Sequence, residues 1–183
     1  MQIELATPRL RIRAASARDA PNLLAYHERN RDRFRLWEPD PPPNFYTLGY
    51  WERFAAGEAG DAPGDSRLRL LALEPDDTTL VASVNLQSIE RGVIQRTILG
   101  YSIDATYEGL GLAREAVGAI VTYAFETLRL HRVEANYQPS NARSAALLRA
   151  LEFVIEGYAR DYLFLDGAWR DHILTSRTNP NPR

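Results

Sequence analysis

A six-residue run at 108–113, Glu-Gly-Leu-Gly-Leu-Ala, has the pattern best suited to holding an anion. An apolar stretch with the character of a short strand precedes it, and apolar residues spaced three and four apart follow it. A glycine turn that opens a helix leaves N–H groups unpaired and adds the positive end of the helix dipole. This pattern predicts a pyrophosphate site, although two glycines at this spacing also suit a turn without a ligand.

Two common phosphate-binding loops do not fit this run. A Walker loop needs a Lys after its last Gly, and the chain contains no Lys. A dinucleotide fingerprint needs a third Gly or Ala where Arg114 stands. The ligand expected at this turn therefore belongs to neither class.

The surrounding elements should place this turn at the edge of a sheet. Apolar residues that alternate predict strands over 7–13, 68–73, 80–86, 95–104, 133–137, 154–165 and 169–175. Apolar residues spaced three and four apart, with capping signals, predict helices from Ser16 or Asp19, over 48–56, after the 108–113 run as far as residue 128, and over 142–151. Successive prolines make residues 36–43 an irregular loop, and residues 57–65 suggest a mobile surface loop. Asp166-Gly167 predicts a hairpin turn, Asn141 predicts a helix cap, and the arginines of 7–13 predict a solvated face.

Length and composition are those of one soluble domain over residues 1–183. The formal charge of −2 gives no support for nucleic-acid binding, and no leader or membrane-length apolar run is present, so we expect a cytoplasmic protein. The three histidines have no metal spacing, so no metal is expected. Because cysteine is absent, any acyl transfer should be direct.

Several segments together resemble one family. They are the E-x-x-G-x-A run at 108–113, TPRLRIR at 7–13, ANYQPSNARSAALLRALEF at 135–153 and EGYARDYLFLDGAWRDHILTS at 156–176. The chain resembles the GNAT acyltransferases over 7–176, in particular their ribosomal-protein alanine N-acetyltransferase branch, the RimJ and RimL type. The resemblance implies an α/β (α+β) fold with a mixed, mostly antiparallel, splayed sheet flanked by helices. It also implies acetyl-CoA bound between the fourth and fifth strands of the family's core.

The resemblance carries cofactor roles onto matching positions. Tyr101, Ser102 and Ile103 would bond the acetyl-pantetheine arm, and Asn141 would hold it at the start of a helix. The residues that would cradle the pyrophosphate are Glu108, Gly109, Leu110, Gly111, Leu112, Ala113 and Arg114. The family has Gln or Arg at position 108, so we expect the Glu108 carboxylate to turn outward while its N–H still contributes.

The catalytic groups are less defined by the resemblance. Asn136 stands where some relatives carry a catalytic Glu, and Leu163 stands where others do. Glu38 is therefore the first candidate for the base, with Glu90 and Glu134 behind it and a plain loop charge as the alternative for Glu38.

The leaving thiolate raises a similar question. Leu148 occupies the position of the family's Tyr acid, so Ser144, or else Ser140, is the candidate donor to sulfur, with helix capping as the alternative role. Glu152 replaces the Gly usual before Phe153, which leaves the helix end uncertain.

Three aromatic residues, Trp37, Tyr162 and Trp169, match the branch and would line an acceptor groove, unless they belong to the core. The function expected is acetylation of a protein N-terminus, most simply that of a ribosomal protein beginning with Ala or Ser. An acetyltransferase of a small amine, such as an antibiotic or polyamine, and a CoA-binding regulatory protein with weak catalysis remain as alternatives.

Overall fold

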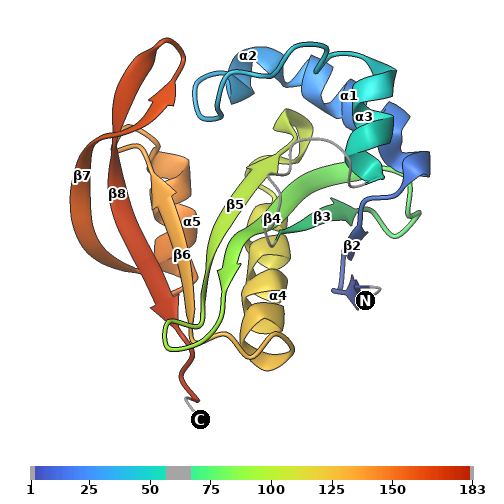
Figure 1. Ribbon diagram of the computed structural model, residues 1–183. Coiled ribbons are helices and arrows are strands. Elements are labelled where there is room, and N and C mark those ends of the chain that lie inside the picture. Colours follow the sequence, from blue (N-terminus) through green and yellow to red (C-terminus); the bar gives the residue numbers. More distant parts are fainter. Residues whose placement is uncertain (1–2, 57–66, 182–183) are drawn as a thin grey trace.

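The computed structural model describes residues 3–56 and 67–181 and is built on an eight-stranded sheet (Figure 1). The strands lie in the order β1-β2-β3-β4-β5-β6-β8-β7. Their bounds are β1 Glu4–Ala6, β2 Arg11–Ala14, β3 Leu68–Leu73, β4 Leu80–Glu90, β5 Arg96–Ile103, β6 Arg132–Tyr137, β7 Val154–Leu165 and β8 Ala168–Thr178. All neighbouring strands are antiparallel except β5 and β6, which are parallel. The sheet is therefore mixed and mostly antiparallel, as the sequence predicted.

Helices cover both faces of the sheet. They are α1 Ala20–Arg29, α2 Arg31–Phe34, α3 Leu48–Ala55, α4 Leu112–Glu126 and α5 Ala142–Ala150, with 3-10 turns η1 Ala17–Asp19 and η2 Ala105–Tyr107. Leu70 and Ala72 face the core under α4 and α5, whereas Leu71 and Leu73 face the core formed with α1 and α3. Because side chains alternate along a strand, β3 is buried on both faces and anchors both layers.

The central sheet splits between β5 and β6. These parallel strands pair only from Arg96 to Ile98, opposite Arg132 to Glu134. Beyond this junction β5 stays with β4 to Ile103 and β6 stays with β8 to Tyr137, so the two ribbons diverge in Figure 1. The splayed sheet expected from the sequence is confirmed.

Residues 31–43, which comprise α2 and the irregular segment after it and are here called the WEP loop, lie near the open end of this gap (Figure 1). The WEP loop is fixed to both sides of the gap. Gln138 Nε2, after β6, donates to Leu36 O at 2.8 Å, and Arg35 lies 3.3 Å from Asp166 in the β7–β8 turn. The expected absence of helix after Leu36 is confirmed, and the ties position the loop over the gap.

The N-terminal strand prediction is wrong in its bounds. Residues 7–13 contain a tight connection, in which Thr7 N donates to Leu10 O at 2.9 Å, between the separate strands β1 and β2. The solvated arginine face is also wrong at Arg13, whose side chain lies between Asp19 and Asp77, 2.7 Å from each. Arg13 lowers the pKa of the nearly buried Asp19 against the opposing effect of burial.

The other local predictions agree with the structure to within a few residues. Asn141 Oδ1 accepts from Ser144 N at 3.0 Å and caps α5. Asp166 and Gly167 have φ values of 48° and 71°, which suit a two-residue hairpin turn. The loop predicted over 57–65 lies outside the described residues. Of the helices in the described part of the chain, none has the length and apolarity to cross a membrane.

Candidate active site

The glycine turn joins β5 and η2 to α4. Gly109 and Gly111 have φ values of 73° and 78°, and Gly111 is the N-cap of α4. Among the described residues, a Cβ built on Gly109 meets nothing within 4 Å, and one on Gly111 meets only Arg9 Nη2, at 3.5 Å. In the part of the chain that the structure describes, this 15-residue helix begins at Gly111 without a side-chain cap. Left-handed backbone, open space and uncapped N–H groups therefore fit a bound phosphate.

The Glu108 carboxylate, just before this turn, forms ion pairs with two arginines. It pairs with Arg33 of α2 and, at 2.6 Å, with Arg143 of α5. Arg9 fixes the turn from the other side, donating to Leu110 O at 2.8 Å while pairing with Glu115. The charge that would oppose a pyrophosphate is thus compensated by two guanidinium groups.

The candidate pantetheine residues lie on the β5 wall of the gap. Tyr101, Ser102 and Ile103 pair with Val84, Ser83 and Ala82 of β4, and all three lie beyond the last residue paired with β6. Their edge toward β6 therefore has no strand partner, so backbone groups are available to a ligand. Across the gap, Asn141 uses Oδ1 to cap α5, and its holding of the pantetheine arm stays a prediction.

A pair of hydroxyl groups spans the floor of the gap. Tyr101 Oη and Ser144 Oγ are 2.5 Å apart and share a hydrogen bond. Burial raises the pKa of Tyr101 to about 12, and the Ser144 bond opposes that rise. Leu148, at the family's Tyr position, is buried in the core instead. Sequence reasoning placed Tyr101 by its backbone alone and missed its hydroxyl, because 43 residues separate the two partners.

Glu38, in the WEP loop, is half-buried beside β5. Burial raises its pKa to about 7, and the nearby Ser102 hydroxyl opposes the rise. Ser102 Oγ in turn accepts a hydrogen bond from the buried Tyr26 hydroxyl at 3.2 Å. A carboxylate with this pKa is suited to accept a proton near neutral pH.

The two lesser base candidates have guanidinium partners. Glu90 lies 2.8 Å from Arg96, and Glu134 lies 2.7 Å from Arg132. Both belong to the end of the sheet where β5 and β6 are still paired. Glu38 therefore remains the stronger candidate for the base.

Only some of the residues proposed for the acceptor side contact one another. Asn136 Nδ2 donates to the Tyr162 hydroxyl at 3.2 Å, and Asn136 Oδ1 accepts from Thr175 N at 3.3 Å. Trp37, Tyr162 and Trp169 expose 37%, 38% and 60% of their surface, so they are not core residues. Trp169 packs edge-on against Phe164 near the β7–β8 turn. The structure joins Asn136 to Tyr162 and leaves Trp169 on the exposed hairpin.

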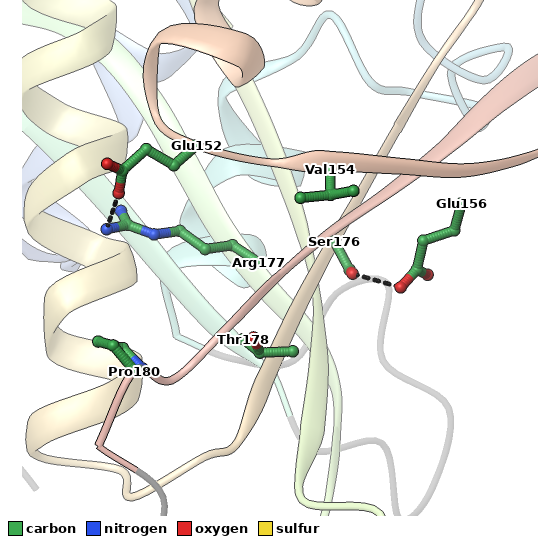
Figure 2. A pocket seen from close by; sticks show the side chains of 7 residues that line it. All are labelled: Glu152, Val154, Glu156, Ser176, Arg177, Thr178 and Pro180. Atoms are coloured by element: carbon green, nitrogen blue, oxygen red, sulfur yellow. Dashed lines mark hydrogen bonds and ion pairs between the residues drawn. The ribbon is translucent and has the colours of Figure 1, made fainter.

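The open cavity in Figure 2 lies away from this site. Its volume is about 390 Å³, and it is lined by Glu152, Val154, Glu156, Ser176, Arg177, Thr178 and Pro180. Ser176 and Thr178 pair in register with Glu134 and Arg132, at the paired end of the junction. None of the candidate site residues lines this cavity, so we assign it no role in the chemistry despite its size.

The comparisons with known proteins agree with this geometry. The acetyltransferase (GNAT) domain family matches residues 9–154, so the chain belongs to the GNAT family and is an acyltransferase. Enzymes of this family use acetyl-CoA.

Individual relatives narrow the likeness. The [ribosomal protein uS5]-alanine N-acetyltransferase of Escherichia coli (strain K12) is 38% identical over 181 residues, covering 98% of this chain and 93% of that protein. Among solved structures, the ribosomal-protein-S5-alanine acetyltransferase from Vibrio fischeri matches with a TM-score of 0.89 and 31% identity over 99% of both chains. Mycobacterium smegmatis RimJ in complex with CoA-disulfide matches with a TM-score of 0.86 and 26% identity, over 99% of this chain and 90% of that one. The resemblance and fold expected from the sequence are confirmed.

Proposed function

We propose that this protein transfers acetyl from acetyl-CoA directly to the N-terminal α-amine of a cytoplasmic protein, a ribosomal protein beginning with Ala or Ser. The observation that carries the proposal is the half-buried Glu38, whose pKa is raised to about 7 beside the gap. The N-terminal acetyltransferase relatives, which are named for acting on an alanine of a ribosomal protein, support the choice of acceptor.

The amine sets the requirement for a base. An α-amine has a pKa of about 7.7 to 8.0 and is partly neutral at pH 7, whereas a lysine amine near about 10.4 is almost wholly charged. A carboxylate with a pKa of about 7 is matched to the first of these. Glu38 would favour the approaching ammonium and take up its proton, directly or through water.

The other residues divide the remaining tasks. The co-substrate supplies an acetyl thioester, whose carbonyl oxygen gains negative charge during attack. The unpaired edge of β5 at Tyr101 to Ile103 would donate backbone N–H to that oxygen, a contribution worth roughly 3 to 4 kcal/mol. Ser144 would donate to the sulfur, and the 108–114 turn would hold the pyrophosphate.

Acceptor binding would fall to the opposite side. Asn136 with Tyr162, Trp37 of the WEP loop and Trp169 of the hairpin would line the peptide groove. A large first side chain should not fit near the sheet gap, whereas later residues would lie in a more open channel.

A peptide panel tests the acceptor. Peptides beginning with Ala, Ser or Phe, each with a free or a blocked N-terminus, are compared with a blocked lysine peptide and spermidine. We expect acetylation of the free Ala and Ser peptides, much less of the Phe peptide and none of the blocked ones, measured by mass spectrometry. Robust acetylation of blocked lysine peptides or spermidine, with free N-termini untouched, would refute the proposal.

A further inference from the structure

The ion cluster around Glu108 joins three elements at the edge of the glycine turn. Arg33 comes from α2, Arg143 from the first turn of α5, and Glu108 follows η2. The Glu108 side chain is 21% exposed, whereas Arg143 is 77% exposed although it is only 2.6 Å from the carboxylate. The cluster is therefore open to solvent at its Arg143 end.

The charges in this cluster do not balance. The ion pairs before and after the turn are matched one to one, Arg29 with Asp104 at the start of η2 and Arg9 with Glu115 in α4. Here, among the residues that the structure describes, two guanidinium groups share one carboxylate, so one positive charge is in excess. Each guanidinium also has five N–H donors, more than a shared carboxylate can use.

The position of the excess charge determines which ligand suits it. Glu108 immediately precedes Gly109, and the left-handed Gly111 opens α4 with uncapped N–H groups. Guanidinium groups bind phosphate oxygens in a two-pronged geometry, and helix N-termini favour the same ligand. Two independent features thus favour phosphate on the same side of the turn.

We propose that Arg33 and Arg143 bind phosphate groups of CoA, and that Glu108 holds both side chains beside the turn while the site is empty. Phosphate and Glu108 compete for the same guanidinium groups. This deepens the function proposed above and rests on CoA binding at this turn. It also explains how a carboxylate is tolerated where the family has Gln or Arg.

Calorimetry with CoA and with 3′-dephospho-CoA tests the proposal on four variants. R33Q and R143Q should each weaken CoA binding about fivefold or more and reduce its dependence on salt, because a phosphate contact is lost. E108Q should tighten CoA binding about threefold or more, because a competing charge is removed. R149Q, near the other end of α5, is the matched control and should change nothing.

The second ligand locates the phosphate. If the effects of R33Q and R143Q disappear with 3′-dephospho-CoA, the arginines bind the 3′-phosphate, and if they persist, the arginines bind the pyrophosphate. Thermal unfolding of each variant shows that it is folded, and Arg143 is exposed enough that its loss should not disturb the core.

Two results would overturn the inference. One is unchanged CoA affinity and salt dependence in both arginine variants, and the other is weaker CoA binding in E108Q. A wild type that binds CoA and acetylates peptide while giving either result would refute only the arginine roles. A wild type that binds no CoA would refute the proposed function itself.

Discussion

The two walls of the central gap are built in different ways. On one wall, β5, the glycine turn and α4 follow one another between Arg96 and Glu126, and the backbone makes most of the site. On the acceptor side, Asn136 and Tyr162 come from β6 and β7, and Glu38 comes from the WEP loop, which reaches over the gap to lie beside β5. The first wall depends on local conformation and the second on side chains brought together by tertiary contacts. Changes on the two walls should therefore affect binding and chemistry separately.

The largest expected effect is on the chemical step. Glu38→Gln should lower kcat/KM for an Ala peptide by about 10²-fold while CoA affinity barely changes, because only the proton acceptor is lost. Since the base acts when deprotonated, activity should fall as pH drops through about 7, the pKa of Glu38. Below that pH, log kcat/KM of the wild type should fall with a slope of about one, because Glu38 must be deprotonated to take the proton of the bound ammonium. In the variant, which can use only the neutral amine, log kcat/KM should fall already below the amine pKa of about 7.7 to 8.0.

The control for this variant is Glu28→Gln on the exposed surface of α1, which should leave kcat/KM and its pH profile unchanged. If Glu134→Gln or Glu90→Gln loses activity and Glu38→Gln does not, the base lies at the paired end of β5 and β6. Such a result would break the assignment of chemistry to the WEP loop.

A smaller effect is expected on the other wall. Gly111→Val should raise the Kd for CoA about tenfold or more, equivalent to roughly 1.4 kcal/mol, because a branched side chain enters the space left for phosphate. It should also lower the free energy of unfolding by about 1 to 3 kcal/mol, because φ is 78°. Calorimetry and urea unfolding measure the two effects.

Gly92→Val separates strain from binding. Gly92 has a φ of 77° in the β4–β5 turn, and a Cβ there meets nothing within 4 Å. This variant should lose similar stability and keep the CoA affinity of the wild type. If both glycine variants lost the same CoA affinity, backbone strain, and not the blocking of the phosphate position, would explain the weaker binding of Gly111→Val.

The smallest effect is on stability alone. Glu152, after α5, has a φ of 62°, which explains why Gly is usual there. Glu152→Gly should raise the free energy of unfolding by about 1 kcal/mol by removing this strain. Its ion pair with Arg177 should cost little when lost, since the Glu152 side chain is 77% exposed.

Glu152→Ala is the matched control, because it removes the ion pair and keeps the strained backbone. It should show no gain in urea unfolding. An equal gain in both variants would mean that the carboxylate, and not the backbone, is the destabilising feature.

The same contrast explains what the sequence could predict. The β5 wall was predictable because its signals, the 108–113 run and the period of α4, are local. The cap at Asn141, across the gap, is also a local signal. The hairpin turn at Asp166-Gly167 was predictable for the same reason.

Contacts between distant residues were not predictable in this way. The hydrogen bond between Tyr101 and Ser144 and the pairing of Glu108 with Arg33 depend on how separate elements pack. The burial of Arg13 was not predicted because alternation in a strand does not show that the Asp19 carboxylate of η1 lies beside its side chain. The roles of the site residues, and one domain over 1–183, stay predictions.

The short junction between β5 and β6 determines how a small change in strand angle moves the end of β5. Three residue pairs join the two halves of the sheet there, and β5 continues for residues 99–103 beyond it. At about 3.3 Å per residue, the end of β5 lies about 17 Å from the junction. A bend of about 5° at the junction therefore moves that end by about 1.4 Å relative to β6. A displacement of about 1 Å in a reacting group can cost about 10²-fold in rate. The stiffness of this small junction, together with the Tyr101–Ser144 hydrogen bond and the contacts of the WEP loop, therefore contributes to how accurately the two walls face each other during catalysis.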